Sequence, residues 1–310
     1  MTKQSFYIIN SETNKKEKIE FKESDIKINS FFKVKNKNNE NNPQIILIKE
    51  NEIWLVDYSF SKIIGKDYSQ ILKGYYKEGI QIDKFIFAFT SNKIASGGED
   101  KITFCNINTK KPFNIRNNSL ILSTTGLYLM SLDNDDNNKI LLCACKKYIK
   151  AQKNGILLIS DLKNIDKSNY DIKRNIKFYN TKGFEVHCFC QISIIVEENL
   201  LTVSKTKKTN YFFVGGFDTK KYRGGIKLYK IKKNNEEIIE IEKIQDIVLK
   251  NEYEFKNKNN LFKGPISCIK QSKNDIKILI ITCWDGNVYL FKNPNIEKFI
   301  SIESNIDSIF

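Results

Sequence analysis

One pattern occurs five times along the chain and limits what the chain can fold into. Each copy has a short apolar run, a polar or glycine-bearing turn, and a second apolar run that often ends at an aromatic residue or an aspartate. Such a pattern predicts a β-hairpin. The copies lie at Ile45–Tyr58, Lys93–Ile107, Lys139–Leu162, Tyr211–Ile231 and Lys277–Asn293. Repetition at intervals of some tens of residues indicates a repeat architecture.

Further strands are expected before and after each hairpin. More polar runs follow the hairpins, for example Ile176–Asn180 and Glu240–Leu249. The apolar runs that precede the hairpins are Ile26–Val34, Ile80–Phe89, Gly126–Leu132, Phe184–Val196 and Gly264–Gln271. Four antiparallel strands in each repeat make the blade of a β-propeller. The sequence therefore predicts an all-β fold in which residues 1–310 form a single propeller domain.

The two ends of the chain supply strands for one more blade. Asn305–Phe310 resembles a first strand with nothing after it, and the N-terminal segment at 5–22 resembles outer strands with nothing before them. Joined, residues 5–22 and 305–310 would form a composite blade that closes the ring and leaves no long exposed sheet edge. This count favours six blades.

Other blade numbers depend on the remaining segments. Seven blades would follow if a weak blade lay within Asp161–Phe184 or Lys232–Phe262, and five if the ring did not close at the chain ends. The long polar segments are expected to be mobile surface loops because they cannot bury enough apolar area to order themselves. They are Asn36–Asn42, Lys163–Asn175, Ser204–Thr209 and Lys250–Asn260. No long amphipathic helix is expected.

The formal net charge of +15 invites a nucleic-acid partner, because clustered Lys and Arg attract phosphate over long range. The excess is almost all Lys, however, and arginine occurs only at Arg116, Arg174 and Arg223. The chain is rich in Asn and Ile as well as Lys, a combination typical of proteins encoded by AT-rich genomes. The charge alone therefore does not select a partner.

Cysteine usage and the absence of long apolar stretches indicate in which compartment of the cell the protein is expected. The seven cysteines lie nearly all in predicted strands, which favours reduced, buried thiols. No apolar run approaches the roughly 18 residues of a membrane span, and the first residues lack a signal-peptide pattern. We expect an intracellular protein, cytoplasmic or nuclear, without membrane insertion.

Two of the hairpins, Ser96–Ile107 and Thr282–Phe291, resemble WD40 repeats. In that family an Asp in the tight turn, a Ser or Thr in the preceding strand and an aromatic in the following strand take part in a buried hydrogen-bonded brace. The resemblance assigns this structural role in the turns to Ser96, Asp100, Thr282 and Asp285. The histidine that the family carries in each repeat is lacking, because the chain has one histidine, His187. The family's tryptophan is missing from the third strands, and Trp284 lies in a turn instead. We therefore expect apolar packing to hold the blades together, at about 25 cal/mol per Å².

A second, smaller resemblance concerns Val214–Ile231 and the following Gly264–Gln271. These segments are similar to the propellers of large damage-binding and cleavage-factor scaffolds. That resemblance implies assembly within a multiprotein complex.

Metal-binding residue types crowd together only at His187, Cys188 and Cys190, with Cys143 and Cys145 as further candidates. Residues two apart share one face of a strand, so Cys188 and Cys190 point together while His187 points away. No C-x-x-C pair is present to start a tetrahedral site. We therefore expect core packing and no bound metal.

Catalysis and phosphate binding also lack a clear pattern. His187 has no obvious carboxylate partner in sequence. Glu185, Asp83 or Asn305 could hold a divalent ion in a central channel, as in propeller hydrolases. The glycine pairs at 97–98, 215–216 and 224–225 are expected to serve tight turns or close backbone approach. No catalytic residue and no cofactor are predicted.

Two elongated hairpin turns carry the most promising chemistry. Lys146–Asn154 and Asp218–Gly225 each join several cations to a Tyr, and in a propeller both would project from the same face. Such residues suit RNA, through base stacking and phosphate contact, or an acidic peptide. The candidate partner-binding residues are Lys146, Lys147, Tyr148, Lys150, Lys153, Lys220, Lys221, Tyr222 and Arg223.

Three functions follow from these observations. The first is a non-enzymatic scaffold or adaptor that binds other proteins within a larger complex, a step that rests partly on fold analogy. The alternative is a propeller that binds RNA through its basic, Tyr-bearing turns. A metal-dependent propeller hydrolase is a distant third.

Overall fold

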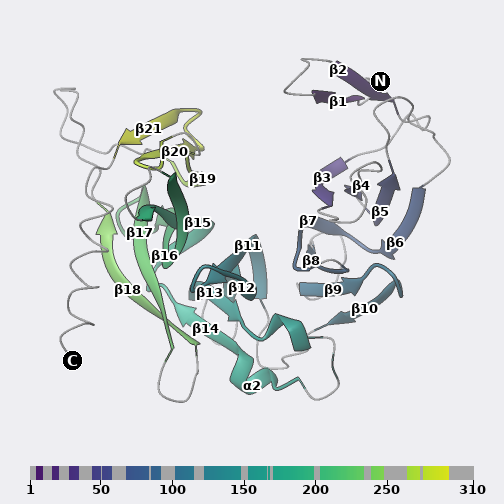
Figure 1. Cartoon of the computed structure of the whole chain (residues 1–310), viewed down its shortest axis with the longest axis horizontal. Coiled ribbons are helices and arrows are strands. Elements are labelled where there is room, and N and C mark those ends of the chain that lie inside the picture. Colours follow the sequence, from purple (N-terminus) through teal and green to yellow (C-terminus); the bar gives the residue numbers. More distant parts are fainter. Residues whose placement is uncertain are drawn as a thin grey trace. The chain divides into compact units, whose positions relative to one another are not determined.

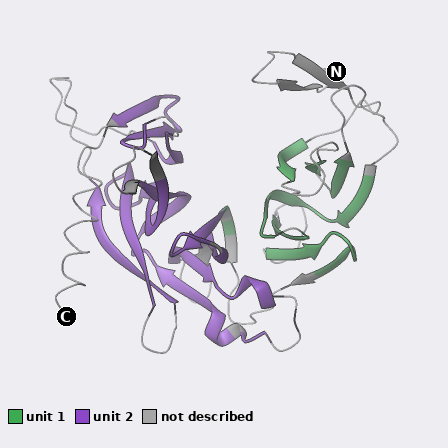
Figure 2. Ribbon diagram, in the orientation of Figure 1, with its two compact units in different colours: residues 1–127 green, residues 128–310 purple. Residues whose placement is uncertain are grey.

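The computed structural model of the chain divides into two compact units, residues 1–127 and 128–310 (Figure 2). Its regular structure is almost entirely β-strand (Figure 1). The structure describes residues 5–9, 16–20, 28–34, 44–49, 51–57, 68–83, 85–91, 102–114, 122–147, 153–165, 167, 170–198, 203–233, 239–247, 264–272 and 275–292. The all-β prediction is therefore confirmed for these residues.

The described residues of the first unit form three antiparallel sheets. One has two strands, β1 (Ser5–Ile9) and β2 (Lys16–Glu20). The others have the strand orders β3-β4-β5-β6 and β10-β9-β8-β7. Their strands are β3 (Ile28–Val34), β4 (Gln44–Lys49), β5 (Glu52–Asp57), β6 (Tyr68–Lys73), β7 (Tyr76–Gln81), β8 (Ile86–Ser91), β9 (Ile102–Asn106) and β10 (Lys111–Asn114).

The second unit contains sheets of orders β11-β12-β13-β14, β15-β16-β17-β18 and β19-β20-β21 among its described residues. β11 crosses the boundary between the units. The strands are β11 (Leu122–Leu132), β12 (Asp135–Lys147), β13 (Lys153–Ile159), β14 (Ile176–Asn180), β15 (Phe184–Glu198), β16 (Val203–Asp218), β17 (Arg223–Lys233), β18 (Ile239–Ile247), β19 (Ile266–Gln271), β20 (Ile278–Cys283) and β21 (Val288–Lys292). Two short helical segments, η1 (Leu162–Asn164) and α2 (Ile172–Asn175), lie between β13 and β14.

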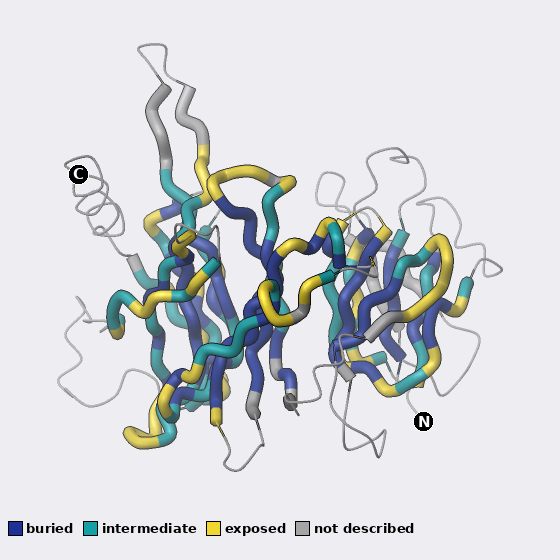
Figure 3. Tube along the Cα trace, turned by 90° about the horizontal axis from the view of Figure 1, so that it is seen from below, coloured by how far each residue is buried: buried dark blue, intermediate teal, exposed yellow. Residues whose placement is uncertain are grey.

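Apolar side chains fill the space between neighbouring sheets within each unit. In the second unit, one cluster joins residues of β11–β13 to residues of β15–β17, and another joins β15–β17 to β19 and β20. In the first, the sheet of β3–β6 packs on that of β7–β10. The middle of the central strand β12, residues 140–145, is buried on both faces and is therefore a continuous apolar run. Figure 3 shows the buried stretches of the chain as dark blue tube. The expected apolar packing between sheets is present.

Glutamine side chains add polar links between the sheets of the second unit. The Gln191 amide on β15 donates to the carbonyls of Ser131 (2.5 Å) and Thr209 (2.7 Å) and accepts from the Ser131 N–H (3.3 Å). One sheet further on, the Gln271 amide on β19 donates to the Ser193 carbonyl (2.9 Å) and accepts from its N–H (2.7 Å). Each glutamine thus binds the main chain of the preceding sheet's first strand, a brace that the sequence pattern did not reveal.

The predicted hairpins are largely confirmed, with one error. The run at Ile80–Phe89 is not a single strand: it contains the end of β7, a turn, and the start of β8. Asp83 makes this turn, because its Oδ1 accepts from the N–H groups of Phe85 and Ile86, both at 2.8 Å. The hairpin therefore pairs β8 with β9, and the expected first strand at 93–96 lies outside the described residues.

The four-stranded unit is confirmed in four of the described sheets. The N-terminal strands β1 and β2 pair with each other, whereas residues 305–310 lie outside the described residues. The composite blade, the number of blades, the closure of the ring and the single domain over 1–310 therefore stay predictions.

Two segments expected to be loops are partly regular. Residues 163–175 contain most of η1 and all of α2, where the buried side chains of Leu162 and Ile165 anchor the connection. Residues 204–209 belong to β16, which pairs with the end of β15. The expected loops at 36–42 and 250–260 lie outside the described residues. Within the described part of the chain, no helix has the length and apolarity needed to cross a membrane.

Candidate functional site

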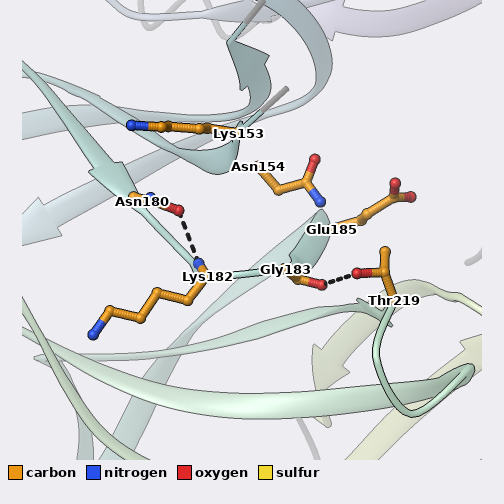
Figure 4. Close-up of a pocket in the computed structure, with 7 residues that line it drawn as sticks. All are labelled: Lys153, Asn154, Asn180, Lys182, Gly183, Glu185 and Thr219. Atoms are coloured by element: carbon orange, nitrogen blue, oxygen red, sulfur yellow. Dashed lines mark hydrogen bonds between the residues drawn. The ribbon is translucent and has the colours of Figure 1, made fainter. Parts of the chain in front are cut away.

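A cavity of about 360 Å³ opens at one end of two neighbouring sheets in the second unit (Figure 4). Four chain segments meet there: the start of β13, the end of β14 with the turn to β15, the start of β15, and the first residue after β16. The cavity is lined by Lys153, Asn154, Asn180, Lys182, Gly183, Glu185 and Thr219.

The turn between β14 and β15 forms one wall of the cavity. Asn180 Oδ1 accepts from the Lys182 N–H (2.9 Å), and Lys182 and Gly183 both have left-handed backbones, with φ of 53° and 89°. Thr219 fixes this turn from the neighbouring hairpin, since its hydroxyl (2.6 Å) and its N–H (3.0 Å) both donate to the Gly183 carbonyl. The wall is thus held before any ligand binds.

Asn154 lies inside the cavity, where its side chain extends between Lys153 and Glu185 (Figure 4). The residue is only 8% exposed, and its Oδ1 is buried without a hydrogen-bond partner. Its main-chain carbonyl, by contrast, accepts from the Thr181 N–H at 2.9 Å. Because a buried polar atom without a partner destabilises a protein, Asn154 marks the cavity as a candidate site.

Glu185 stands at the other side of the cavity from the lysines, and a bulge in β15 places it there. The register between β15 and β16 shifts between Val186 and Cys188. On β16, Gly216 allows the close approach, because a Cβ atom there would lie 1.8 Å from the Glu185 carbonyl oxygen. The glycine pair at 215–216 thus serves close backbone approach within a strand.

His187 has a carboxylate neighbour that sequence reasoning missed. Its Nε2 lies 3.9 Å from the Glu185 Oε2, and the centroid of its ring lies 5.4 Å from that of Trp284. The Trp284 residue is 68% exposed. A carboxylate and two aromatic rings therefore follow one another, starting from Glu185 in the cavity wall.

The predicted turn after β16 is well ordered. Asp218 Oδ1 accepts from the N–H groups of Lys220 (3.0 Å) and Lys221 (3.1 Å). The Lys221 ammonium also lies 3.9 Å from the Asp218 carboxylate. Tyr222 has a left-handed backbone with φ of 49°, and it is 80% exposed. Arg223 starts β17 and is exposed as well.

The structure brings some of the predicted partner-binding residues together. Lys153 lines the same cavity as Thr219, which directly precedes Lys220, so these parts of the two hairpins lie at one end of their sheets. We call this surface the basic end and define it by Lys153, Lys182, Lys220, Lys221, Tyr222 and Arg223. That these residues bind a partner stays a prediction.

The remaining predicted residues of this surface lie in or next to β12. Lys146 and Lys147 belong to β12 and pair with Asn154 and Lys153, so the turn is shorter than predicted. Tyr148 and Lys150 lie outside the described residues. Lys182 was missed because the Asn-Thr-Lys-Gly turn at 180–183 is too short to stand out among the chain's many lysines.

Asp285 and Thr282, which were expected to brace a turn, both form side-chain hydrogen bonds. Asp285 accepts from the Tyr289 hydroxyl and the Asn287 N–H, both at 2.9 Å, while the Thr282 hydroxyl pairs with that of Ser267 at 2.8 Å. Partial burial tends to raise the pKa of Asp285, but these hydrogen bonds outweigh it and lower the pKa. Ser96 and Asp100 lie outside the described residues.

The cysteines are free thiols in the core or near it. Burial raises the pKa of Cys190 to about 11 and that of Cys145 to about 12, and it raises the pKa of Cys188 further. Such thiols stay protonated at neutral pH, as expected for cysteines that pack in a core. Among the described residues, no three His, Cys, Asp or Glu side chains are grouped as metal ligands would be. Of the proposed ion ligands, Asp83 caps its own turn, and Asn305 lies outside the described residues.

Comparisons with known proteins give distant structural similarities only. No protein-family model and no curated protein match the chain. The β-propeller domain of Myceliophteria thermophila Cps50 (Swd1) is 8% identical, with a TM-score of 0.48 over 92% of this chain and 76% of that chain. Extracellular domains 1–2 of Drosophila semaphorin 1a are 9% identical, with a TM-score of 0.43 over 87% and 66%. The tricorn protease is 9% identical, with a TM-score of 0.26 over 94% and 36%. We draw no functional conclusion from similarities at this level.

Proposed function

We propose that the protein is a non-enzymatic scaffold, an adaptor subunit that binds other proteins within a larger complex through its basic end. The sheets supply a packed support, and the turns at their ends supply exposed binding groups. The proposal depends above all on one residue, Tyr222.

Tyr222 exposes 80% of its surface from a turn that is already fixed. Its left-handed backbone costs roughly 1 kcal/mol, a cost that persists only when the surrounding structure enforces it. Asp218 and Thr219 hold the turn by hydrogen bonds to Lys220, Lys221 and Gly183. An aromatic ring presented in this way loses little conformational entropy on binding, and Tyr is common among the residues that dominate interface energies.

The charge beside Tyr222 indicates the chemistry of the partner. Lys220, Lys221 and Arg223 are neighbours of Tyr222 in the sequence, and Lys153 and Lys182 line the adjoining cavity. Positive groups around an aromatic anchor favour an acidic protein surface, because complementary charge speeds encounter and fixes the orientation of the partner. We therefore infer an acidic partner segment.

The test is purification of the tagged full-length protein from its own cell, followed by mass spectrometry. We expect stoichiometric partner proteins with the unaltered chain and their loss with Tyr222→Ala. The control is Lys163→Glu, because Lys163 is exposed on η1 at the opposite end of β13. A chain that purifies alone, or a Tyr222→Ala variant that retains every partner, would contradict the proposal.

RNA binding is the second candidate, and Tyr222 again supports it. An exposed ring between cations can stack on a base while the cations contact phosphate. In that case the affinity for RNA should fall steeply with salt, and Lys153→Glu, Lys221→Glu and Arg223→Glu should each weaken it. A filter-binding assay at low salt that retains no RNA excludes this function.

A further inference from the structure

The cavity at the basic end is lined by a side chain, Asn154, with one buried polar atom that has no hydrogen-bond partner. Asn154 lines the cavity between Lys153 and Glu185 (Figure 4), although it is only 8% exposed, and the buried atom without a partner is its Oδ1. A side-chain amide offers both acceptor and donor groups, as a peptide unit does. A peptide backbone therefore has the groups that can pair with the Asn154 amide.

Charges of opposite sign stand on the two sides of Asn154. The ammonium groups of Lys153 and Lys182 extend to one side, and the carboxylate of Glu185 extends to the other (Figure 4). Beyond Glu185 come the rings of His187 and Trp284, and the Trp284 ring provides an aromatic face for a cation. The cavity thus suits a ligand that is anionic at one end and cationic at the other.

We propose that this cavity binds an extended segment of a partner protein in which an acidic residue is followed closely by a basic one. The acidic side chain lies between Lys153 and Lys182, the main-chain amide pairs with Asn154, and the basic side chain reaches Glu185. This inference rests on the proposed function, because its ligand is part of a partner protein. A nucleic acid fits less well, since its repeated negative charges would face Glu185.

The experiment measures fluorescence anisotropy with the full-length protein and four labelled probes of equal length. The probes are a peptide of repeated Glu-Gly-Lys, an all-Glu peptide, an all-Lys peptide and oligouridylate. At physiological salt we expect the mixed-charge peptide to bind most tightly. Tightest binding of any other probe would overturn the inference, and oligouridylate in that place would indicate nucleic acid.

Three variants test the assigned contacts. Lys153→Glu and Glu185→Gln should each weaken binding of the mixed-charge peptide by roughly tenfold, as expected for loss of a charge-assisted contact. Lys163→Glu is the matched control and should leave the affinity unchanged. Glu185→Gln is decisive, because removal of a negative charge would strengthen the binding of any polyanion. Stronger binding by this variant would refute the inference.

Asn154→Leu separates binding from folding. Leucine has a similar volume and removes a polar group without a partner, so the free energy of unfolding should stay the same or rise. Binding of the mixed-charge peptide should nevertheless fall roughly tenfold. If Asn154 serves only the fold, the variant will be less stable and will bind the peptide normally.

The two proposals can fail separately. The first outcome is that Tyr222→Ala loses the partner proteins while Asn154→Leu and Glu185→Gln retain them. This result would support the scaffold function and overturn the assignment of the cavity. A protein that purifies alone but binds the mixed-charge peptide with the expected variant pattern would overturn the scaffold function and leave the cavity assignment standing.

Discussion

Gly216 determines, at the scale of single residues, how closely β16 can approach the bulge that carries Glu185. An alanine Cβ at this position would lie 1.8 Å from the Glu185 carbonyl oxygen, a main-chain atom that can move only with its strand. Gly216→Ala should therefore lower the free energy of unfolding by about 1–3 kcal/mol, and it should also weaken peptide binding at the cavity. Urea unfolding and fluorescence anisotropy measure the two effects.

The matched control for Gly216 is its cross-strand partner, Gly225 on β17. A Cβ on Gly225 would lie 3.2 Å from the edge of the Phe184 ring, a side-chain contact that can relax. We expect Gly225→Ala to destabilise the protein less than Gly216→Ala. Equal losses for the two variants would show that the approach of β16 to Glu185 is not the limiting contact.

The buried thiol of Cys145 makes stability depend on pH. Burial raises its pKa to about 12 in the folded protein, whereas the unfolded thiol ionises near its ordinary pKa of 9.0. Below the pKa of the unfolded thiol, the contribution of Cys145 to the free energy of unfolding is fully present. As pH rises from there toward the pKa of the folded thiol, the free energy of unfolding falls by about 1.4 kcal/mol per pH unit.

This dependence can be measured with Cys145→Ala. The variant should be less stable than the parent at about pH 8, because it loses buried volume, but its stability should fall less between about pH 9 and 11. Urea unfolding at several pH values gives both slopes. An identical decline in parent and variant would contradict the assigned pKa.

Some residues of the candidate site were accessible from the sequence and others were not. Lys153 and Tyr222 could be found because a polar turn between apolar runs exposes its residues. Glu185 was recognised only as a carboxylate near the start of a strand, because the bulge at Val186 depends on Gly216 from another part of the chain. Asn154 is unusual only through its burial, which composition does not reveal.

At the scale of elements, hydrogen bonds from glutamine link one sheet to the next. The Gln191 amide binds both main-chain groups of Ser131 and the carbonyl of Thr209, and Gln191 is itself buried. Gln191→Leu would remove all three of these hydrogen bonds, so we expect a loss of about 2 kcal/mol or more in the free energy of unfolding. Thermal and urea unfolding measure the loss.

Gln245→Leu is the matched control for this brace, since Gln245 lies half-buried on β18. It should change stability by less than about 0.5 kcal/mol. Gln191→Glu supplies a further check, because a carboxylate of similar shape cannot donate to the two carbonyls. If both Gln191 variants were as stable as the parent, apolar packing alone would hold these sheets together.

The strand pattern predicted elements well wherever a turn carries a clear polar signal. It failed at Ile80–Phe89, where Asp83 turns the chain within a run that is otherwise rich in apolar residues. The sheet-to-sheet braces were also hidden, because Gln191 and Gln271 lie in apolar strands and form their contacts with residues 60 and 78 positions away. The spacing of apolar residues along the sequence predicts single strands, whereas hydrogen bonds between sheets depend on how the sheets pack against each other.

At the scale of the whole molecule, the net charge of +15 should attract any polyanion at low salt. This long-range attraction is screened beyond about 8 Å at physiological ionic strength, while contacts at hydrogen-bond distance in the cavity persist. Oligouridylate binding should therefore fall steeply between about 50 and 200 mM salt and should not respond to Asn154→Leu. Binding of the mixed-charge peptide should fall less and should respond to Asn154→Leu at every salt concentration. Anisotropy titrations across this range give both slopes, and equal slopes for the two probes would mean that diffuse charge, rather than the cavity, governs what the protein binds.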